Sequence, residues 1–187
     1  MTSGYGSHFP ILAAALARTT GPVLECGIGD FSTPMIHYAT MPNRLVVSAD
    51  TDPDWICKFK GYSSNRHNFY LVEPAGDDAL PPVTRKIEGW QKFSIIDQFS
   101  WGCVFLDCAP GEARHEIAIR LSKRAELIVA HDSETDYQSG GNYQYDKAKP
   151  HFRFVSEFKK WRPYTLILSN VMEFKIEDCD ATWEPPK

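Results

Sequence analysis

The sequence predicts a single doubly wound α/β domain, in which a mostly parallel sheet carries helices on both faces. Several runs of the chain are almost wholly apolar, as strands are when both faces of their sheet are buried. These runs alternate with segments of helical pattern, which is the arrangement of parallel α/β folds. The 187 residues, of which 43% are hydrophobic, suffice for one substantial core. We therefore expect one domain over residues 1–187.

The predicted elements follow one another in a regular order. A first helix is expected within residues 1–20. Ser7 or His8 can cap its start, and the helix is expected to end near Arg18. Pro34 and Pro53 mark the first turns of two later helices. Five apolar runs are expected to form strands, at residues 21–26, 43–50, 67–74, 101–107 and 125–132. The helices between these strands are expected at residues 32–40, 52–60, 83–97 and 112–125.

The last part of the chain departs from this alternation. Residues 151–161 are predicted as a helix, and residues 164–170 and 171–177 as two strands. Only the break at Ser169 and Asn170 separates the two strands, and so short a link permits only an antiparallel hairpin. We expect this hairpin, residues 164–177, to close the sheet.

Residues 133–147 form a polar segment, rich in glycine and tyrosine, directly after the fifth strand. Loops of this length in compact domains are often functional lids. From such a lid, Tyr137, Tyr143 and Tyr145 could stack on a ring or a sugar. Tyrosines are also common in ordinary loops, which is the alternative. We expect this segment to be a lid over a binding site.

Charge and cysteine content narrow the class of partner. The net charge is -4 and no basic stripe runs along the chain, so nothing favours nucleic acid. The five cysteines are odd in number and contain no Cys-x-x-Cys pair, which indicates reduced thiols in an intracellular compartment. The apolar run at residues 9–17 is too short to span a bilayer. We expect a cytoplasmic protein with a small-molecule substrate and no membrane partner, and a homodimer stays open.

Ionisable side chains gather where the predicted strands end. In open α/β sheets, ligands bind beyond the carboxyl ends of the strands. Four of the five predicted strands deliver such a group to that edge. These groups are Glu25, Asp50, Asp107 and the pair His131 and Asp132. The sequence therefore predicts a ligand-binding crevice with several charged groups at its rim.

The turn after the first strand resembles a dinucleotide loop only in part. Gly27 and Gly29 are in place, but Ser32 stands where a third glycine is expected. Glu25 and Asp30 flank the glycines, and a pyrophosphate is repelled by neighbouring carboxylates. The turn therefore counts against NAD and an NAD-dependent oxidoreductase.

A ligand with a cationic amino-acid part and a ribose suits the same turn. S-adenosyl-L-methionine carries an ammonium, a sulfonium and two ribose hydroxyls. Asp50 lies 21 residues beyond Gly29, at a strand end, where a carboxylate can accept both hydroxyls. The nearby Asp30 and Asp52 are equally explained as helix-capping acids.

Four segments together resemble the class I S-adenosylmethionine-dependent methyltransferases. They are GPVLECGIGDFSTPMI, LVVSADTDPDW, VFLDCAPGEAR and IVAHDSE, in this order. The resemblance covers about residues 5 to 177 and is nearest to a branch of small-molecule and sugar O-methyltransferase-like proteins. It implies a Rossmann-like sheet of seven strands in the order 3-2-1-4-5-7-6, with strand 7 antiparallel.

The resemblance also implies ligand contacts. It puts Glu25, Gly27 and Gly29 around the methionine part and Asp50 on the ribose. Ser32 and Thr33 match the positions of small hydroxyl residues in the family motif. His8 belongs to a segment, residues 6–8, that matches one flanking the methionine end. For the adenine, Asp77 or Asp78 is a candidate, with solvated turn residues as the favoured alternative.

Methyl transfer to a hydroxyl requires alignment and removal of a proton. Asp107, His131 and Asp132 are the predicted catalytic residues on the acceptor side. His131 could be a general base. Alternatively, Asp107 with Asp132 or His131 could hold a divalent metal such as Mg²⁺. Neighbouring strand residues point to opposite faces, which argues against two ligands from one such pair.

Two charged residues of this region, Asp132 and Arg114, also have purely structural explanations. Asp132 could be a turn or cap residue at the strand exit. Arg114 could anchor an acidic substrate, although an ion pair with Asp107 or Glu116 is favoured.

The sequence thus predicts an S-adenosylmethionine-dependent methyltransferase that acts on a small-molecule or sugar hydroxyl. The alternatives are a non-catalytic cofactor-binding or interaction protein of the same fold, and an NAD-dependent oxidoreductase.

Overall fold

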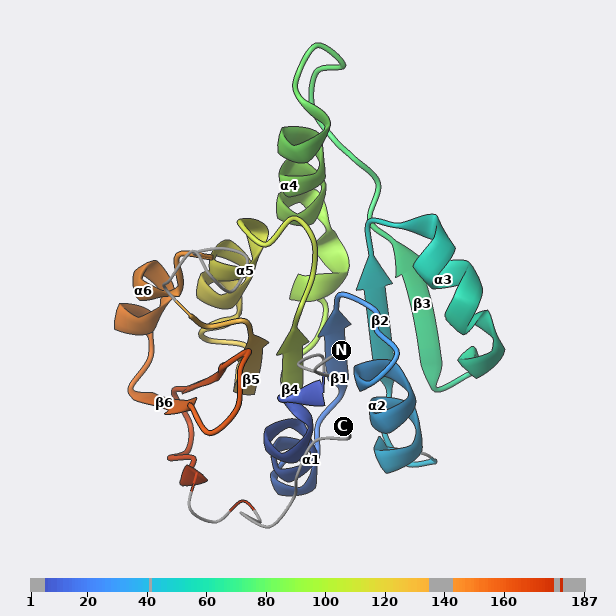
Figure 1. The fold of residues 1–187 in the computed structure, drawn as a ribbon. Helices are drawn as coiled ribbons and strands as arrows, with labels where there is room; N and C mark the ends of the chain where they lie inside the picture. Colours follow the sequence, from blue (N-terminus) through green and yellow to red (C-terminus); the bar gives the residue numbers. More distant parts are fainter. Residues whose placement is uncertain (1–5, 41, 135–142, 177–178, 180–187) are drawn as a thin grey trace.

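The computed structural model describes residues 6–40, 42–134, 143–176 and 179 (Figure 1). Seven strands form one sheet in the order β3-β2-β1-β4-β5-β7-β6. They are β1 (Val23–Cys26), β2 (Val46–Asp50), β3 (His67–Leu71), β4 (Trp101–Leu106), β5 (Ala125–His131), β6 (Phe154–Phe158) and β7 (Thr165–Ser169). Strands β1 to β5 pair in parallel, while β7 is antiparallel to both β5 and β6. The predicted fold class and strand order are confirmed.

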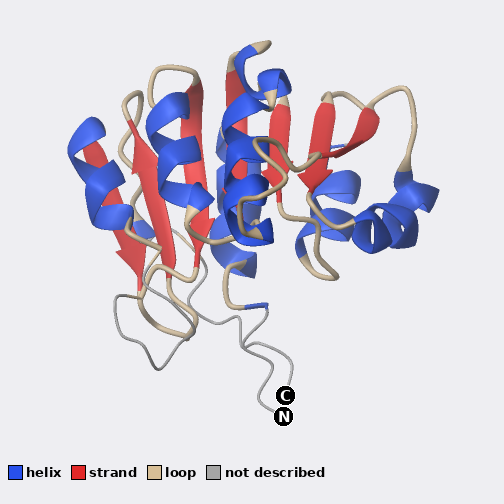
Figure 2. Ribbon diagram, turned by 90° about the horizontal axis from the view of Figure 1, so that it is seen from above, coloured by secondary structure: helices blue, strands red, loops and turns tan. Residues whose placement is uncertain are grey.

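Helices lie on both sides of this sheet (Figure 2). They are α1 (Phe9–Arg18), α2 (Ser32–Thr40), α3 (Pro53–Phe59), α4 (Pro82–Lys92), α5 (Ala113–Leu121) and α6 (Tyr145–Ala148). The predicted cap of α1 is wrong in detail, because His8 occupies the cap position but its side chain makes no capping hydrogen bond. Within the described residues, no helix has both the length and the apolar character needed to cross a membrane.

The central strands are largely apolar because they contribute side chains to two cores. Val23, Phe105 and Leu127 pack with α1 and α2 on one face of the sheet. Their chain neighbours, including Leu24 and Leu106, pack with α5 on the other face. Successive side chains of a strand point to opposite faces. Continuous apolar runs are therefore what this two-sided sheet requires.

At the end of the chain the predicted strand at residues 164–170 is confirmed as β7, but the elements predicted on either side of it are wrong. The segment predicted as a helix, residues 151–161, contains β6, and the hairpin joins β6 to β7 (residues 154–169) instead of covering residues 164–177. Residues 152–158 alternate in exposure, with Phe152 and Phe158 buried and Arg153 exposed, which is the period of a strand. Phe174, on the predicted last strand, is buried against the α1 side of the core without strand pairing.

Candidate functional site

The loop after β1 brings the ends of β1 and β4 together. Gly27 has a φ of +97°, and a β-carbon there would overlap the main chain of Asp107. The amide of Gly27 donates to the carbonyl of Ala49 over 2.9 Å, and the amide of Asp107 donates to that of Cys26 over 2.8 Å. Glycine is required because only glycine combines this dihedral with so close an approach.

Glu25 lies beneath this loop and is fully buried. Its carboxylate accepts hydrogen bonds from the hydroxyls of Ser32 (2.6 Å), Thr33 (2.9 Å) and Ser48 (2.5 Å). The hydroxyl of Thr33 in turn accepts from the amide of Gly29 at 3.0 Å. Burial raises the pKa of Glu25 to about 7, although the three hydroxyls oppose the shift. Glu25 therefore supports the loop from below instead of facing the cavity above it.

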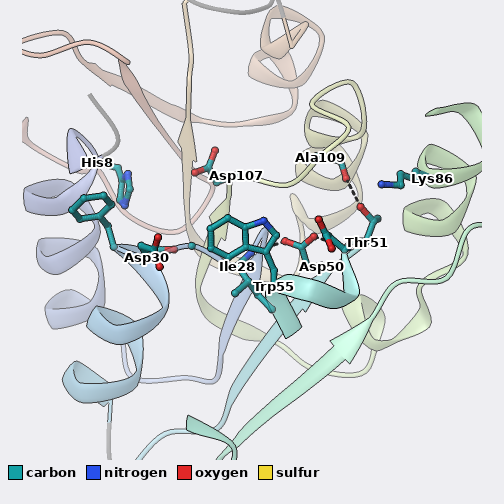
Figure 3. Close-up of a pocket in the computed structure, with 13 residues that line it drawn as sticks. His8, Ile28, Asp30, Asp50, Thr51, Trp55, Lys86, Asp107 and Ala109 are labelled. Atoms are coloured by element: carbon teal, nitrogen blue, oxygen red, sulfur yellow. Dashed lines mark hydrogen bonds between the residues drawn. The ribbon is translucent and has the colours of Figure 1, made fainter. Parts of the chain in front are cut away.

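A cavity of about 520 Å³ opens at the carboxyl ends of β1, β2 and β4 (Figure 3). Five of the predicted site residues line it: His8, Gly29, Ser32, Asp50 and Asp107. The volume lies in the range of pockets that hold small molecules and cofactors. The strand-end rule thus leads to this cavity, and the binding roles of its residues stay a prediction.

Asp50 lines this cavity near its α3 side. One carboxylate oxygen accepts from the amide of Ile28 at 2.8 Å and the other from the amide of Asp52 at 2.9 Å. Burial raises the pKa of Asp50. Each carboxylate oxygen has a further lone pair with which to accept a ligand hydroxyl. The carboxylate of Asp52 caps α3, accepting from the amide of Asp54 at 2.9 Å, which confirms the capping alternative for this acid.

Trp55 is a cavity residue that the sequence did not single out. It comes from the first turn of α3, and its indole stands over the cavity between Asp30 and Asp50 (Figure 3). The ammonium of Lys58 lies 4.5 Å from the centre of the Trp55 ring and 2.6 Å from a carboxylate oxygen of Asp30. The sequence signal for Trp55 was its position at the start of the helix that directly follows the strand end at Asp50.

Another lining residue is Lys86 of α4. By contrast, the predicted adenine candidates Asp77 and Asp78 lie in an exposed turn, where Asp78 pairs with Arg85 at 2.8 Å. The favoured turn alternative therefore describes these two acids better.

Asp107 and His131 form a hydrogen-bonded pair at the other end of the cavity. The distance from Nδ1 of His131 to the Asp107 carboxylate is 3.2 Å, and the hydroxyl of Ser7 lies 3.0 Å from Nε2 of the same ring. Burial alone would lower the pKa of His131, but the charge and hydrogen bond of Asp107, together with the charge of Asp132, outweigh burial and raise it. Burial likewise raises the pKa of Asp107, but His131 and Arg114 together lower it. These shifts favour the ionised form of the pair, and both ring nitrogens of His131 are already engaged, by Asp107 and Ser7.

Arg114 holds the same carboxylate from a second direction. Its guanidinium lies 3.0 Å from Asp107 and 3.0 Å from Asp132, and it also donates to the carbonyls of Cys108 and His131. The predicted ion pair with Asp107 is confirmed, and its second acid is Asp132 instead of Glu116. Asp132 has a φ of +57°, so its carboxylate turns back from the end of β5 toward Arg114.

A divalent metal does not fit this cluster well. Ligand atoms of Asp107, His131 and Asp132 do lie within 4.8 Å of one another. However, Arg114 already supplies the cation to both carboxylates, and His131 is held in its protonated form by the same acids. Mg²⁺ would need free oxygen ligands in octahedral geometry and would be repelled by both cations.

Two tyrosines of the predicted lid pack on the protein. Tyr145 is buried in α6 and its hydroxyl donates to the carbonyl of His131 at 3.1 Å. The ring of Tyr143 lies 4.3 Å from the guanidinium of Arg114 and fills the space beside Gly111. Residues 135–142, which include Tyr137, lie outside the described residues, so the lid itself stays a prediction.

No protein-family model matches the sequence, and no curated protein matches it. Several solved structures resemble it. Human methyltransferase-like protein 13 in complex with S-adenosylhomocysteine (SAH) has a TM-score of 0.57 at 13% identity, over 94% of this chain and 85% of that one. A Klebsiella pneumoniae protein assigned as an O-methyltransferase has a TM-score of 0.55 at 13% identity, over 89% and 80%. The Methanococcus jannaschii fibrillarin pre-rRNA processing protein has 0.53 at 12%, over 89% and 77%.

At these identities the likeness shows the fold alone. The chain has the Rossmann-like, seven-stranded fold of class I S-adenosylmethionine-dependent methyltransferases. One similar structure holds SAH and another is that of a pre-rRNA processing protein, so the fold alone does not define the substrate.

Proposed function

We propose that the protein is an S-adenosylmethionine-dependent methyltransferase that acts on the hydroxyl of a small molecule or sugar. The observation that carries the proposal is the composition of one cavity. Asp50 stands at one end of it, Asp107 at the other, and the glycine loop lies between them. S-adenosylmethionine, a nucleoside linked to a cationic amino acid, needs these groups in this spatial order.

The roles follow from position. Asp50 accepts the ribose hydroxyls through its free lone pairs, and Trp55 covers the base. Gly29 and Ser32 border the methionine part, while Glu25, Gly27 and Thr33 hold the loop in place without entering the cavity. Asp107 faces the acceptor, and His131, Asp132 and Arg114 keep it charged and oriented. No metal is part of the proposal, because Arg114 occupies the position that an ion would need.

The same groups argue against a dinucleotide. Asp30, Asp50 and Asp52 all line the cavity, and a pyrophosphate placed there would meet three carboxylates. Among the described residues that line this cavity, Lys86 is the one lysine or arginine. An NAD-dependent reaction is therefore disfavoured, as the glycine turn already indicates.

Calorimetric titration tests the cofactor. SAH is expected to bind in the micromolar range or more tightly, and NAD not detectably. Asp50→Ala should weaken SAH binding by about 1.5–3 kcal/mol, the scale of lost hydrogen bonds to a charged group. Asp78→Ala is the matched control, because this acid is exposed and outside the cavity. Equal affinity for NAD and SAH would reject the assignment.

A panel of acceptors tests the reaction. The panel holds phenols, catechols, monosaccharides and uronic acids, with short RNA as the macromolecular outcome, and product is detected by mass spectrometry. Transfer to a small hydroxyl compound is expected. We further propose that the protein acts without nucleic acid, on account of its net charge of -4, and in the cytoplasm, on account of its odd number of cysteines without a Cys-x-x-Cys pair. SAH binding without transfer to any member would favour the non-catalytic alternative.

A further inference from the structure

His8 is a buried imidazole whose two ring nitrogens lack hydrogen-bond partners. Its exposed fraction is 2%, and neither Nδ1 nor Nε2 has a partner within the described part of the chain. A buried polar group without a partner costs about 1–3 kcal/mol. His8 also lines the cavity, at the end where Asp107 lies (Figure 3). A bound molecule is the natural source of the missing hydrogen bond.

The ring of His8 is held in place by its neighbours. Its centre lies 4.7 Å from that of Phe105 and 4.6 Å from that of His131, the second contact being edge to face. The backbone carbonyl of His8 accepts from the amide of Leu12 at 2.9 Å in the first turn of α1. The ring of such a side chain has a fixed orientation, which a catalytic group requires.

The two neighbouring histidines differ in charge and in freedom. His131 is engaged on both nitrogens, by Asp107 and Ser7, and those surroundings keep it protonated. Burial, together with the positive His131, lowers the pKa of His8 to about 3, while Asp107 opposes the shift. At neutral pH His8 is therefore uncharged, with one nitrogen able to accept a proton. Paired groups that are shifted apart in this way mark the acid and base assignments of a site.

We propose that His8 is a catalytic residue that accepts the hydrogen bond of the acceptor hydroxyl and takes up its proton. This inference rests on the proposed function. As the bond from the acceptor oxygen to the methyl carbon forms, the bond from that carbon to sulfur breaks and its electron pair stays on sulfur. The hydroxyl proton passes to the free nitrogen of His8, and the charges balance.

The weak basicity of His8 is sufficient for this step. A methylated oxygen that still carries its proton is an oxonium, which is a far stronger acid than an imidazolium. The Asp107 carboxylate favours the charge of the imidazolium formed on His8, although burial and His131 together oppose it more strongly, so the proton is held only briefly. The assignment differs from the sequence expectations, which offered His131 as one candidate for the base and placed His8 beside the methionine part of the cofactor.

Histidine-labelled protein provides a test that needs no turnover. SAH-loaded protein is titrated with phenol and followed by ¹⁵N NMR of the imidazoles. The His8 resonances are expected to move with phenol while those of His131 stay unchanged, and His8→Ala should weaken phenol binding at least tenfold. Absence of phenol binding, or binding that leaves His8 unmoved, would overturn the inference.

Variants give the second readout, with the acceptor that the panel identifies. His8→Ala should keep SAH affinity within threefold and lose at least 100-fold in kcat, with partial recovery in added imidazole. His115→Ala is the matched control, since His115 is a buried histidine with an unpartnered Nδ1 that does not line the cavity. Loss of SAH affinity above tenfold, with 5′-methylthioadenosine binding unchanged, would make His8 a ligand of the amino-acid part and overturn the catalytic role. Absence of SAH binding in the wild type would instead reject the proposed function itself.

Discussion

The main chain of Asp107 occupies the space in which a side chain of Gly27 would lie. The end of β4, which carries the candidate catalytic acid, is thereby set directly against the ligand loop after β1. The φ of +97° at Gly27 and this contact together leave no room for any other residue. The two ends of the candidate site are therefore coupled through one glycine.

Gly27→Ala should disturb both stability and ligand binding. Its left-handed dihedral alone costs about 1–2 kcal/mol for a residue with a β-carbon, and the overlap with Asp107 adds to this. Chemical denaturation should show a loss of at least about 2 kcal/mol, and SAH affinity should fall. Gly61→Ala is the control, because a β-carbon at Gly61 meets nothing within 4 Å. Wild-type stability and affinity in Gly27→Ala would show that the β4 end can move without harm.

Arg114 should decide whether the acidic cluster can bind a metal. Arg114→Met removes the cation between Asp107 and Asp132 and leaves their carboxylates to repel each other. Breaking a buried ion pair costs about 3–5 kcal/mol, so a lower Tm is expected. Millimolar Mn²⁺ or Mg²⁺ should raise the Tm of this variant by several degrees and leave the wild type unchanged.

Arg120→Met is the matched control for this experiment, since Arg120 also pairs with an acid, Asp97, but far from the cluster. Its Tm should not respond to metal. A metal-dependent rise in the Tm of the wild type would instead revive the metal hypothesis for Asp107 and Asp132.

The sequence predicted the first five strands because each is a continuous apolar run that two cores require. The hairpin was misplaced because residues 152–158 contain polar side chains at three of their seven positions. Such a segment fits a helix or an edge strand, and only pairing with β7 decides. The apolar side chains Met172, Phe174 and Ile176 have the period of a strand but pack on the core without one.

The residues of the candidate site were found by the strand-end rule, but their orientation was not. Glu25 and Asp50 both end or nearly end strands, yet only Asp50 faces the cavity. Whether a side chain points above or below a loop depends on contacts with other elements, such as Ser48 of β2. The orientation of the His8 ring depends in the same way on another element, because the ring packs against His131 at the end of β5.

Glu25 should make stability depend on pH through neutrality. Its pKa is 4.5 when unfolded and about 7 when folded, so between these values the folded state holds more protons. Stability from this group therefore falls as pH rises from about 4.5 to about 7, by about 3 kcal/mol, and is level above that. Glu25→Gln keeps the shape of the side chain but cannot titrate: its amide oxygen can still accept from Ser32 and Thr33, while its amide nitrogen would donate to Ser48. The difference in unfolding free energy between wild type and Glu25→Gln should follow this curve.

His8 and His67 oppose this trend, because their lowered pKa values remove stability as pH falls below 6.5. Comparing the wild type with the Glu25→Gln variant cancels their contribution. Glu173→Gln, at an exposed position, is the control and should leave the curve unchanged. A difference that stays constant from pH 4 to 8 would mean that folding does not shift the pKa of Glu25.

Asp107 is expected to be the residue that turnover needs most. Its carboxylate reaches the cavity while His131 and Arg114 hold it, so its charge serves both the acceptor and the ion-pair cluster. Asp107→Asn preserves size and removes the charge. SAH affinity should change less than threefold, whereas turnover with the panel acceptor should fall about 100-fold or more. Loss of one partner of buried His131 and Arg114 should also lower stability by about 1–3 kcal/mol.

Capping of α5 does not explain the need for Asp107, because α5 begins at Ala113 with Glu112 in the cap position. Asp78→Asn is the matched control, since Asp78 is exposed and outside the cavity. Stability is measured by denaturation alongside the kinetics, so a folding defect is separated from a catalytic one. A folded Asp107→Asn variant with full turnover would remove Asp107 from the chemistry and leave His8 as the group that meets the acceptor.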